Sequence, residues 1–206
     1  MKTKVSIILV CLIGMASSAY ATVYNGVCGE HLTWTYDTGT GDMIIEGYGK
    51  LEKTVDSLWW NSPVVQIAQY SNNYKATSPK RVILPEGVTS ICSGAFSNFA
   101  LMTECNVPDG VTKIGSSAFS GCSKLKHMFL PNSVDTIGAS AFNECKALDS
   151  LDCGKGVKYI GGQAFFNCDN LDYLRWSDSL EYLGRLAFDG MSEQGGSYYH
   201  AFPDTL

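Results

Sequence analysis

The feature that most constrains this chain is a hydrophobic motif that recurs every 23 residues, without insertion or deletion. An aliphatic residue is followed four residues later by Ala-Phe, and the Ala-Phe pairs begin at positions 95, 118, 141, 164 and 187. A fixed period of this length is the signature of a solenoid, in which each repeat forms one coil stacked on the last. The aliphatic positions of the motif are Ile91, Ile114, Ile137, Ile160 and Leu183.

Other positions repeat with the same period and predict the parts of one coil. An apolar, variable, apolar segment such as Val82 to Leu84 predicts a short strand that turns two side chains inward. A Val-x-x-Ile-Gly segment predicts a second strand, and Ala-Phe is expected to begin a single helical turn. A cysteine column follows at Cys122, Cys145 and Cys168. Because stacked coils lie about 4.8 Å apart, each column predicts a continuous row of core side chains.

The segment before the repeats lacks the 23-residue period. Residues 31–36 alternate between apolar and polar types, and residues 43–47 contain a short apolar run. A turn rich in Gly and Asp lies between these two segments, which predicts a β-hairpin. Residues 55–70 contain Pro63 and are expected to hold at most a short helix. A solenoid without a cap exposes an apolar face and unpaired strand edges at its first coil. Residues 22–80 are therefore predicted to form an N-terminal β-hairpin cap.

The first 21 residues have the organisation of a secretory signal peptide. Lys2 and Lys4 precede the apolar run from Val5 to Met15, and Ala19-Tyr20-Ala21 supplies the small residues of a cleavage site. The run is too short to span a bilayer, and no membrane span is expected in the rest of the sequence. The sequence therefore predicts a secreted or cell-surface protein.

The predicted organisation has four parts and an acidic charge balance. A signal peptide at 1–21 and a cap at 22–80 precede five coils at 81–190 and an incomplete terminal coil at 191–206. The formal net charge is −5, whereas proteins that bind nucleic acids present basic surfaces. We therefore expect no nucleic-acid partner.

The repeat, with its Leu-Pro, Val-x-x-Ile-Gly, Ala-Phe and Cys-x-x-Leu elements, closely resembles the BspA-like class of leucine-rich repeats. The segments Val27-Cys28-Gly29 and Leu32-Thr33-Trp34 are also similar to that family. The resemblance implies a right-handed α/β solenoid, rich in β-structure, with one ladder of short strands per face. It also implies a secreted or cell-surface protein whose relatives serve in adhesion and in binding host components. The departures are local: Cys92 replaces Gly, Phe99 replaces Cys, and Cys153-Gly154 replaces Leu-Pro.

Strand residues that point outward form columns whose members differ in charge, size and aromaticity. Such columns on a rigid ladder suit the recognition of a protein partner, such as a host or matrix component. Aromatic residues and arginine are the types enriched at binding hot spots. The main hypothesis is therefore adhesion or protein binding without catalysis. The candidate ligand-binding residues are His127, Phe129, Asp152, Tyr173 and Arg175.

An enzymatic interpretation has weaker support. Ser150 is expected one coil from His127, with Asp152 on the same face, which suggests a Ser-His-Asp arrangement. A flat, open ladder offers no evident oxyanion donors, and the family has no fixed catalytic set. No CxxC pair is present and the three histidines lie apart from the cysteine column, so we expect no metal or other cofactor.

Two further hypotheses and one expectation about the thiols remain. Trp34, Trp59 and Trp60 are candidates for an aromatic platform that binds a glycan, although aromatic residues in a cap more often form core. The repeats are also compatible with a purely structural spacer. The cysteine column is expected to consist of free, buried thiols, because parallel stacked side chains have poor geometry for disulfides.

Overall fold

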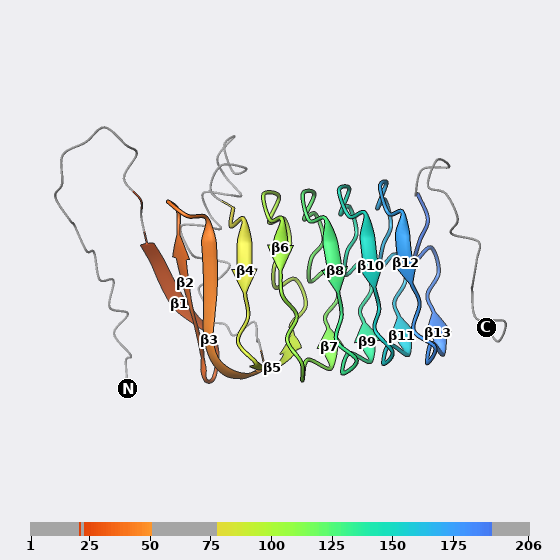
Figure 1. Ribbon diagram of the computed structural model, residues 1–206, viewed down its shortest axis with the longest axis horizontal. Helices are drawn as coiled ribbons and strands as arrows, with labels where there is room; N and C mark the ends of the chain where they lie inside the picture. The colour runs from red at the N-terminus through yellow and green to blue at the C-terminus, as the bar shows by residue number, and fades with distance from the viewer. Residues whose placement is uncertain (1–20, 22, 51–77, 191–206) are drawn as a thin grey trace.

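The computed structural model describes residue 21, residues 23–50 and residues 78–190 of the 206-residue chain. The predicted signal peptide, the predicted short helix at 55–70 and the terminal coil at 191–206 lie outside these residues, apart from Ala21. The described part is an elongated stack of coils with antiparallel strands at its N-terminal end (Figure 1). It is a solenoid of about four turns. Its period of about 23 residues is the one that the repeat predicts.

The N-terminal cap is a meander of three antiparallel strands. Strands β2 (Leu32–Asp37) and β3 (Asp42–Lys50) form the predicted hairpin. Strand β1 (Val23–Gly29) adds a third strand that the sequence did not indicate. Its alternation is broken by Gly26, where a Cβ atom would lie only 2.7 Å from Nε1 of Trp34. The absence of a side chain at Gly26 therefore lets the Trp34 ring pack under β1.

Strand β3 connects the cap to both faces of the solenoid. Its first half pairs in parallel with β4 (Arg81–Ile83), in the register Asp42 to Arg81. Its second half pairs in parallel with β5 (Gly87–Ile91), in the register Tyr48 to Gly87. A single long strand therefore supplies the neighbour that the first coil needs on each of its two faces, which protects the strand edges there.

Two rows of short parallel strands run along the stack. One row, which forms what we call the second face, comprises β5 followed by β7 (Lys113–Ile114), β9 (Thr136–Ile137), β11 (Tyr159–Ile160) and β13 (Tyr182–Leu183). The first row comprises β4 followed by β6 (Glu104–Cys105), β8 (His127–Phe129), β10 (Ser150–Asp152) and β12 (Tyr173–Arg175). We call the outward side of this first row the strand face; it faces the viewer in Figure 1. Its hydrogen-bonded pairing is interrupted between β6 and β8.

The core consists of the columns that the sequence predicts. The aliphatic and phenylalanine positions of the central coils are completely buried. The ring centroids of Phe119 and Phe142 lie 5.0 Å apart with an interplanar angle of 4°, and those of Phe142 and Phe165 lie 5.1 Å apart at the same angle. These separations match the spacing of neighbouring strands, so each ring stacks on the ring of the next coil.

The Ala-Phe segments differ locally from the predicted helical turn, because no helix is present in the part of the chain that the structure describes. Each segment enters through a residue with left-handed backbone, such as Ser117 with φ of 55° or Gln163 with φ of 57°. Alternate amides then donate to the next coil, as the Phe119 N–H does to the Ala141 carbonyl at 2.7 Å. Because these amides bond between coils, they cannot form the internal bonds of a helix.

Candidate ligand-binding face

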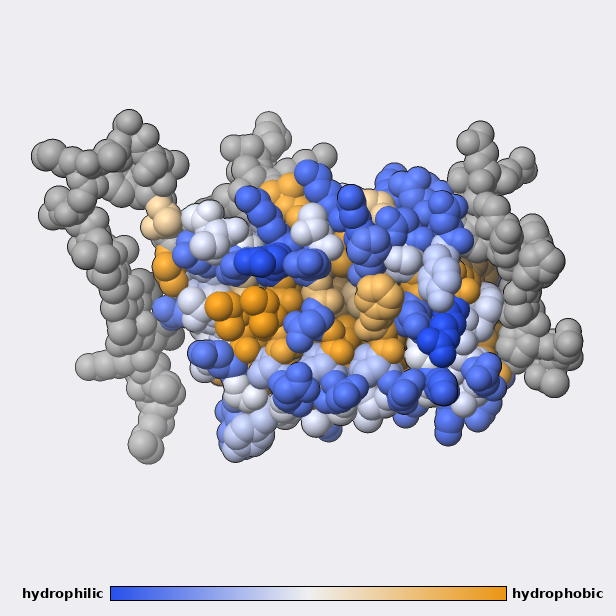
Figure 2. Space-filling view, viewed as in Figure 1, coloured by the Kyte–Doolittle hydropathy of each residue, from blue (hydrophilic) through white to orange (hydrophobic). Residues whose placement is uncertain are grey.

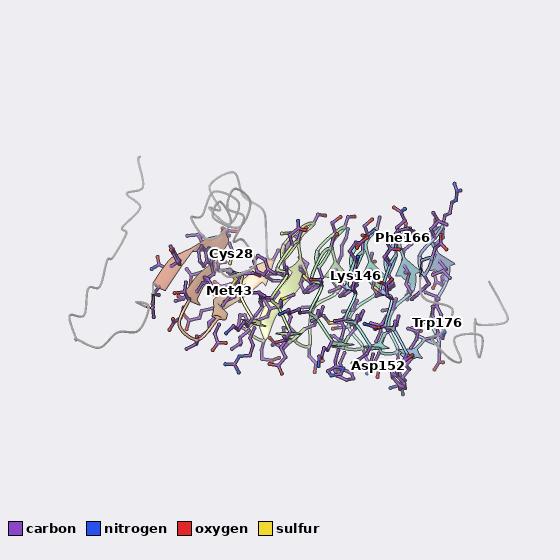
Figure 3. All side chains as sticks on the ribbon, turned by 90° about the horizontal axis from the view of Figure 1, so that it is seen from above. Cys28, Met43, Lys146, Asp152, Phe166 and Trp176 are labelled. Carbon is purple, nitrogen blue, oxygen red and sulfur yellow. The ribbon has the colours of Figure 1, made fainter. Side chains whose placement is uncertain are left out.

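The structure places all five candidate residues on the strand face. His127 and Phe129 lie on β8, Asp152 lies on β10, and Tyr173 and Arg175 lie on β12. Parallel pairing aligns Asp152 with Phe129 on one side and with Arg175 on the other. Seen along the perpendicular direction, Asp152 points away from the side of the stack that carries Phe166 (Figure 3). The prediction that the Asp152 side chain points outward from β10 is therefore confirmed.

The two candidate aromatic side chains are exposed but do not touch each other. Phe129 is 64% exposed and Tyr173 is 54% exposed. They lie two coils apart and in different columns, because Tyr173 aligns with Ser150 and His127. The ring of His127 is the aromatic neighbour of Phe129, with centroids 6.5 Å apart. Each aromatic residue therefore offers a separate contact point for a partner.

The charged candidates act as a pair. The Arg175 guanidinium donates from Nη1 to Oδ2 of Asp152 at 3.0 Å. The other carboxylate oxygen of Asp152 accepts the backbone N–H of Gly154 at 2.9 Å. The carboxylate is therefore held by two donors, and it fixes the orientation of the arginine. Because the pair is solvated, its contribution to stability is small.

His127 lies in a polar cluster that sequence reasoning identified only in part. Its Nδ1 atom lies 2.7 Å from the Ser150 hydroxyl and 2.7 Å from Oδ1 of Asp149, and the hydroxyl donates to that same oxygen at 3.0 Å. In a Ser-His-Asp triad, the serine and the carboxylate contact different ring nitrogens. Here both contact Nδ1, and Asp152 is bonded elsewhere, so the suggested triad geometry is absent. Asp149 was missed because it precedes the strand by one residue.

An apolar patch lies beside the candidate residues at the cap end of the strand face (Figure 2). Ile44 on β3 and Ile83 on β4 are direct partners in the parallel register, and each is 42% exposed. The sequence placed Ile83 in an outward column. It did not show that β3 extends this column with Ile44, because the cap does not share the 23-residue period.

The suggested aromatic platform for a glycan is wrong for Trp34. This residue lies on β2 with only 2% of its surface exposed, so it forms core rather than a stacking surface. Trp59 and Trp60 lie outside the described residues. Among residues 21, 23–50 and 78–190, no group of three or more His, Cys, Asp or Glu could hold a metal ion. Within the same ranges, the structure has no helix long and apolar enough to cross a membrane.

The cysteine column is buried, as predicted. Cys122, Cys145 and Cys168 have no exposed surface, and each thiol donates to a carbonyl at 3.2 Å, such as that of Phe119 for Cys145. Burial raises the pKa of Cys168 to about 12. It also raises the pKa of Cys145 well above its ordinary value. These thiols are therefore protonated and unreactive at neutral pH.

Comparison with solved structures supports the architecture. A leucine-rich repeat protein from T. pallidum matches with a TM-score of 0.54 at 20% identity, over 77% of this chain and 65% of that protein. A leucine-rich repeat protein from Bacteroides ovatus matches with a TM-score of 0.53 at 24% identity, over 78% of this chain and 44% of that protein. A leucine rich cell surface protein from Faecalibacterium prausnitzii matches with a TM-score of 0.52 at 22% identity, over 85% and 47%. This chain thus spans between 44% and 65% of the length of these relatives.

The sequence comparison identifies the family. No curated protein matches the chain significantly. The sequence pattern of the BspA type leucine rich repeat region matches residues 66–193, in six copies. This range covers more than half of the chain and contains every coil described above. The protein therefore belongs to the BspA-type leucine-rich repeat family.

Proposed function

We propose that this protein is secreted or displayed at the cell surface and binds another protein through its strand face, without catalysing a reaction. The observation that carries the proposal is the row of exposed apolar, aromatic and paired charged side chains on this face. Family membership and the predicted signal peptide support an extracellular location. The cell-surface relative from Faecalibacterium prausnitzii is consistent with it.

The properties of the face suit protein recognition. Phe129 and Tyr173 present large apolar surfaces whose rings have few rotatable bonds, so little side-chain entropy is lost on binding. The Arg175 side chain is already oriented by Asp152, which further lowers the cost of ordering it. All of these residues stand on a backbone that is hydrogen bonded between β8, β10 and β12. A partner would therefore meet a preorganised surface.

The absence of catalysis is the second part of the proposal. A serine nucleophile needs a base on one ring nitrogen of histidine and an orienting carboxylate on the other. The Ser150 hydroxyl instead donates to Asp149, and both groups contact the same nitrogen of His127. This arrangement supports a structural role for the cluster, which ties β8 to β10 through side chains.

The test is a triple substitution, Phe129→Ala, Tyr173→Ala and Arg175→Ala. A partner captured from extracellular material with the mature protein serves as the ligand, and calorimetry measures the dissociation constant. We expect binding to weaken by about 2 kcal/mol or more, which corresponds to roughly thirtyfold. The melting temperature should change only slightly, because the replaced side chains are exposed.

A matched control replaces two exposed aromatic residues and one arginine on the other side of the stack. Tyr159 and Tyr182 are 42% and 48% exposed on the second face, and Arg185 is exposed nearby. The variant with alanine at these positions should bind normally. An equal loss of affinity in both variants, or a loss of affinity in the control variant alone, would contradict the proposed binding face. If neither variant affects binding, the partner contacts another part of the protein, and the proposed face is wrong.

A further inference from the structure

Two rows of side chains border the strand face, one on each side of its strands. The leading row holds the residue immediately before each strand, and the trailing row holds the residue six positions later, at the turn toward the second face. All of these residues are exposed except Asp149, which is half-buried. The leading row is Lys80, Thr103, Lys126, Asp149 and Asp172, and the trailing row is Glu86, Asp109, Asn132, Lys155 and Asp178.

The charges of the two rows are opposite in two coils of the stack. In the first coil, the leading row has Lys80 and the trailing row has Glu86. In the coil of β10 the signs are reversed, because the leading row has Asp149 and the trailing row has Lys155. The coils of β6 and β8 combine one charged and one neutral residue, and the coil of β12 has like charges. The rows are therefore complementary to each other rather than to a partner of one charge sign.

The opposite charges of one coil are too far apart to neutralise each other. Lys80 and Glu86 are separated by six residues, which span up to about 20 Å of extended chain. This separation exceeds the screening length of about 8 Å at physiological ionic strength. The contact of Asp149 with His127 holds this carboxylate at the border of the face. The two charges of a coil can therefore act separately on another molecule.

A column of outward residues lies midway between the two rows, and we call it the axial column. Ile83 is three residues from Lys80 and three from Glu86. Ile44 and Ile83 are 42% exposed and Phe129 is 64% exposed. Figure 2 shows the apolar patch of this column between hydrophilic borders. The complete axial column is Ile44, Ile83, Asn106, Phe129, Asp152 and Arg175.

A two-fold axis along the axial column, parallel to the stack, would bring these features together between two copies. Rotation about this axis places the leading row of one copy opposite the trailing row of the other, coil by coil. Lys80 then faces Glu86 of the second copy, and Asp149 faces Lys155 of the second copy. Each of these pairings occurs twice, because a two-fold interface uses the same surface of both subunits.

We propose that the partner bound by the strand face is a second copy of this chain, in a parallel two-fold dimer. The inference deepens the proposed function and rests on it. At the centre, Ile44 and Ile83 meet their own copies in an aliphatic contact, and Phe129 meets its own copy as an aromatic pair. The leading and trailing rows form the polar rim. An apolar centre with a polar rim is the usual composition of a protein interface.

An antiparallel dimer fits the face less well. A two-fold axis across the stack would place the cap end of one axial column against the far end of the other. Ile83 would then face Arg175 of the second copy, and its apolar contact would be lost. Glu86 would also face Asp178 of the second copy, which adds a repulsion. The parallel arrangement keeps apolar residues opposite apolar residues.

The charged end of the axial column is compatible with the parallel arrangement. The two Asp152 carboxylates approach each other near the axis, but each already accepts a hydrogen bond from Arg175 at 3.0 Å and from the Gly154 N–H at 2.9 Å. A guanidinium has several N–H donors in one plane. Each Arg175 can therefore also donate to the carboxylate of the second copy, which offsets the repulsion.

The dimensions of the face fit a weak dimer. The six strands of the face, β3 included, span about 29 Å along the stack, and the seven residues from row to row span at most about 23 Å. The product is roughly 670 Å² for each copy, slightly below the ~800 Å² per partner of a standard interface. We therefore expect a dissociation constant in the micromolar range.

The first test is sedimentation equilibrium of the mature protein. We expect a reversible monomer–dimer equilibrium between about 1 and 200 µM protein. The dissociation constant should rise at least about threefold between about 50 and 500 mM sodium chloride, because salt screens the opposed charges. A monomer at every concentration would overturn the inference alone, since the proposed function is tested separately with the captured partner.

The second test reverses the charges of one opposed pair. Lys80→Glu places a carboxylate opposite Glu86 of the second copy, and Glu86→Lys places an ammonium opposite Lys80 of the second copy. Each variant should dimerise at least about tenfold more weakly, because two like-charge contacts arise in each dimer. An equimolar mixture of the two variants should recover the original affinity, because each introduced charge then faces an opposite one. Weakening without recovery in the mixture would overturn the proposed symmetry.

Substitutions on the two faces separate this inference from the proposed function. Phe129→Ala should weaken the dimer, whereas the double variant Tyr159→Ala, Tyr182→Ala should not. Thermal melting checks that each variant is folded. A dimer that is lost only in the double variant would use the second face, and the inference fails. If the triple variant of the strand face loses a captured partner while the unmodified protein stays monomeric, the proposed function stands and this inference is wrong.

Discussion

The coils from β8 onward and the coils that lead up to β6 are built from the same repeat but stack differently. In the later coils, the rings of Phe119, Phe142 and Phe165 lie parallel within 4°, and strand pairing is continuous on both faces. Before β8, the rings tilt by 38° and the strand face loses its pairing. The regular region has cysteine where the earlier region has Phe99. A larger side chain in the cysteine column thus coincides with the loss of strand pairing between β6 and β8, whereas the repeated buried motif continues through this region.

The largest expected effect tests whether the period controls the whole stack. Removal of residues 115–137, one full period, should leave a folded protein with similar circular dichroism, because every core column keeps its neighbours. Removal of residues 127–137 should unfold it, because strand residues would then occupy turn positions. The two deletions are compared by circular dichroism and thermal melting. Similar behaviour of both proteins would contradict the solenoid interpretation.

A second prediction compares the two regions through their aromatic residues. Phe142→Ala should reduce the free energy of unfolding by about 3–5 kcal/mol, because a completely buried ring is lost between two stacked neighbours. Phe99→Ala should cost clearly less, because removing this ring relieves crowding in its column. Urea denaturation of both variants measures the difference. An equal or larger loss for Phe99→Ala would show that this side chain does not strain the junction.

The third prediction concerns the thiols of the regular region. Cys122, Cys145 and Cys168 should resist an exposed-thiol reagent in the native protein and react only after denaturation. Cys92, which is partly exposed in the earlier region, provides the internal control and should react first. Mass spectrometry of labelled peptides identifies the sites. A disulfide between any two members of the buried column would refute the expectation of free thiols.

The smallest expected effect is a pH dependence of the free energy of unfolding, which arises from the same cysteine column. The pKa of Cys168 is raised by burial from 9.0 to about 12 in the folded protein. Its contribution to stability is therefore complete below pH 9 and declines as the pH rises toward about 12, because the unfolded chain releases the proton first. Cys168→Ala should show a shallower decline in urea denaturation across this range. An unchanged slope would indicate that the thiol is accessible in the native state.

Much of the fold could be predicted from the sequence because a strict period makes every coil meet the same neighbours. Ile114 and Phe119 are buried, and His127 and Phe129 point outward, as their columns require. Any other assignment would place the repeated apolar positions in water in every coil at once, so the repeat selects one register. The candidate face followed from this register, although its individual contacts did not.

Only the tertiary structure decided what depends on distances between particular side chains of neighbouring coils. The position of Asp149 beside His127, the joining of Ile44 to Ile83 and the backbone conformation of Ser117 are of this kind. The break in strand pairing between β6 and β8 is the clearest example. The sequence showed that Phe99 departs from the repeat. Whether neighbouring strands stay paired beside such a residue depends on the volumes of the side chains packed around it. The period of the sequence carries no information about those volumes.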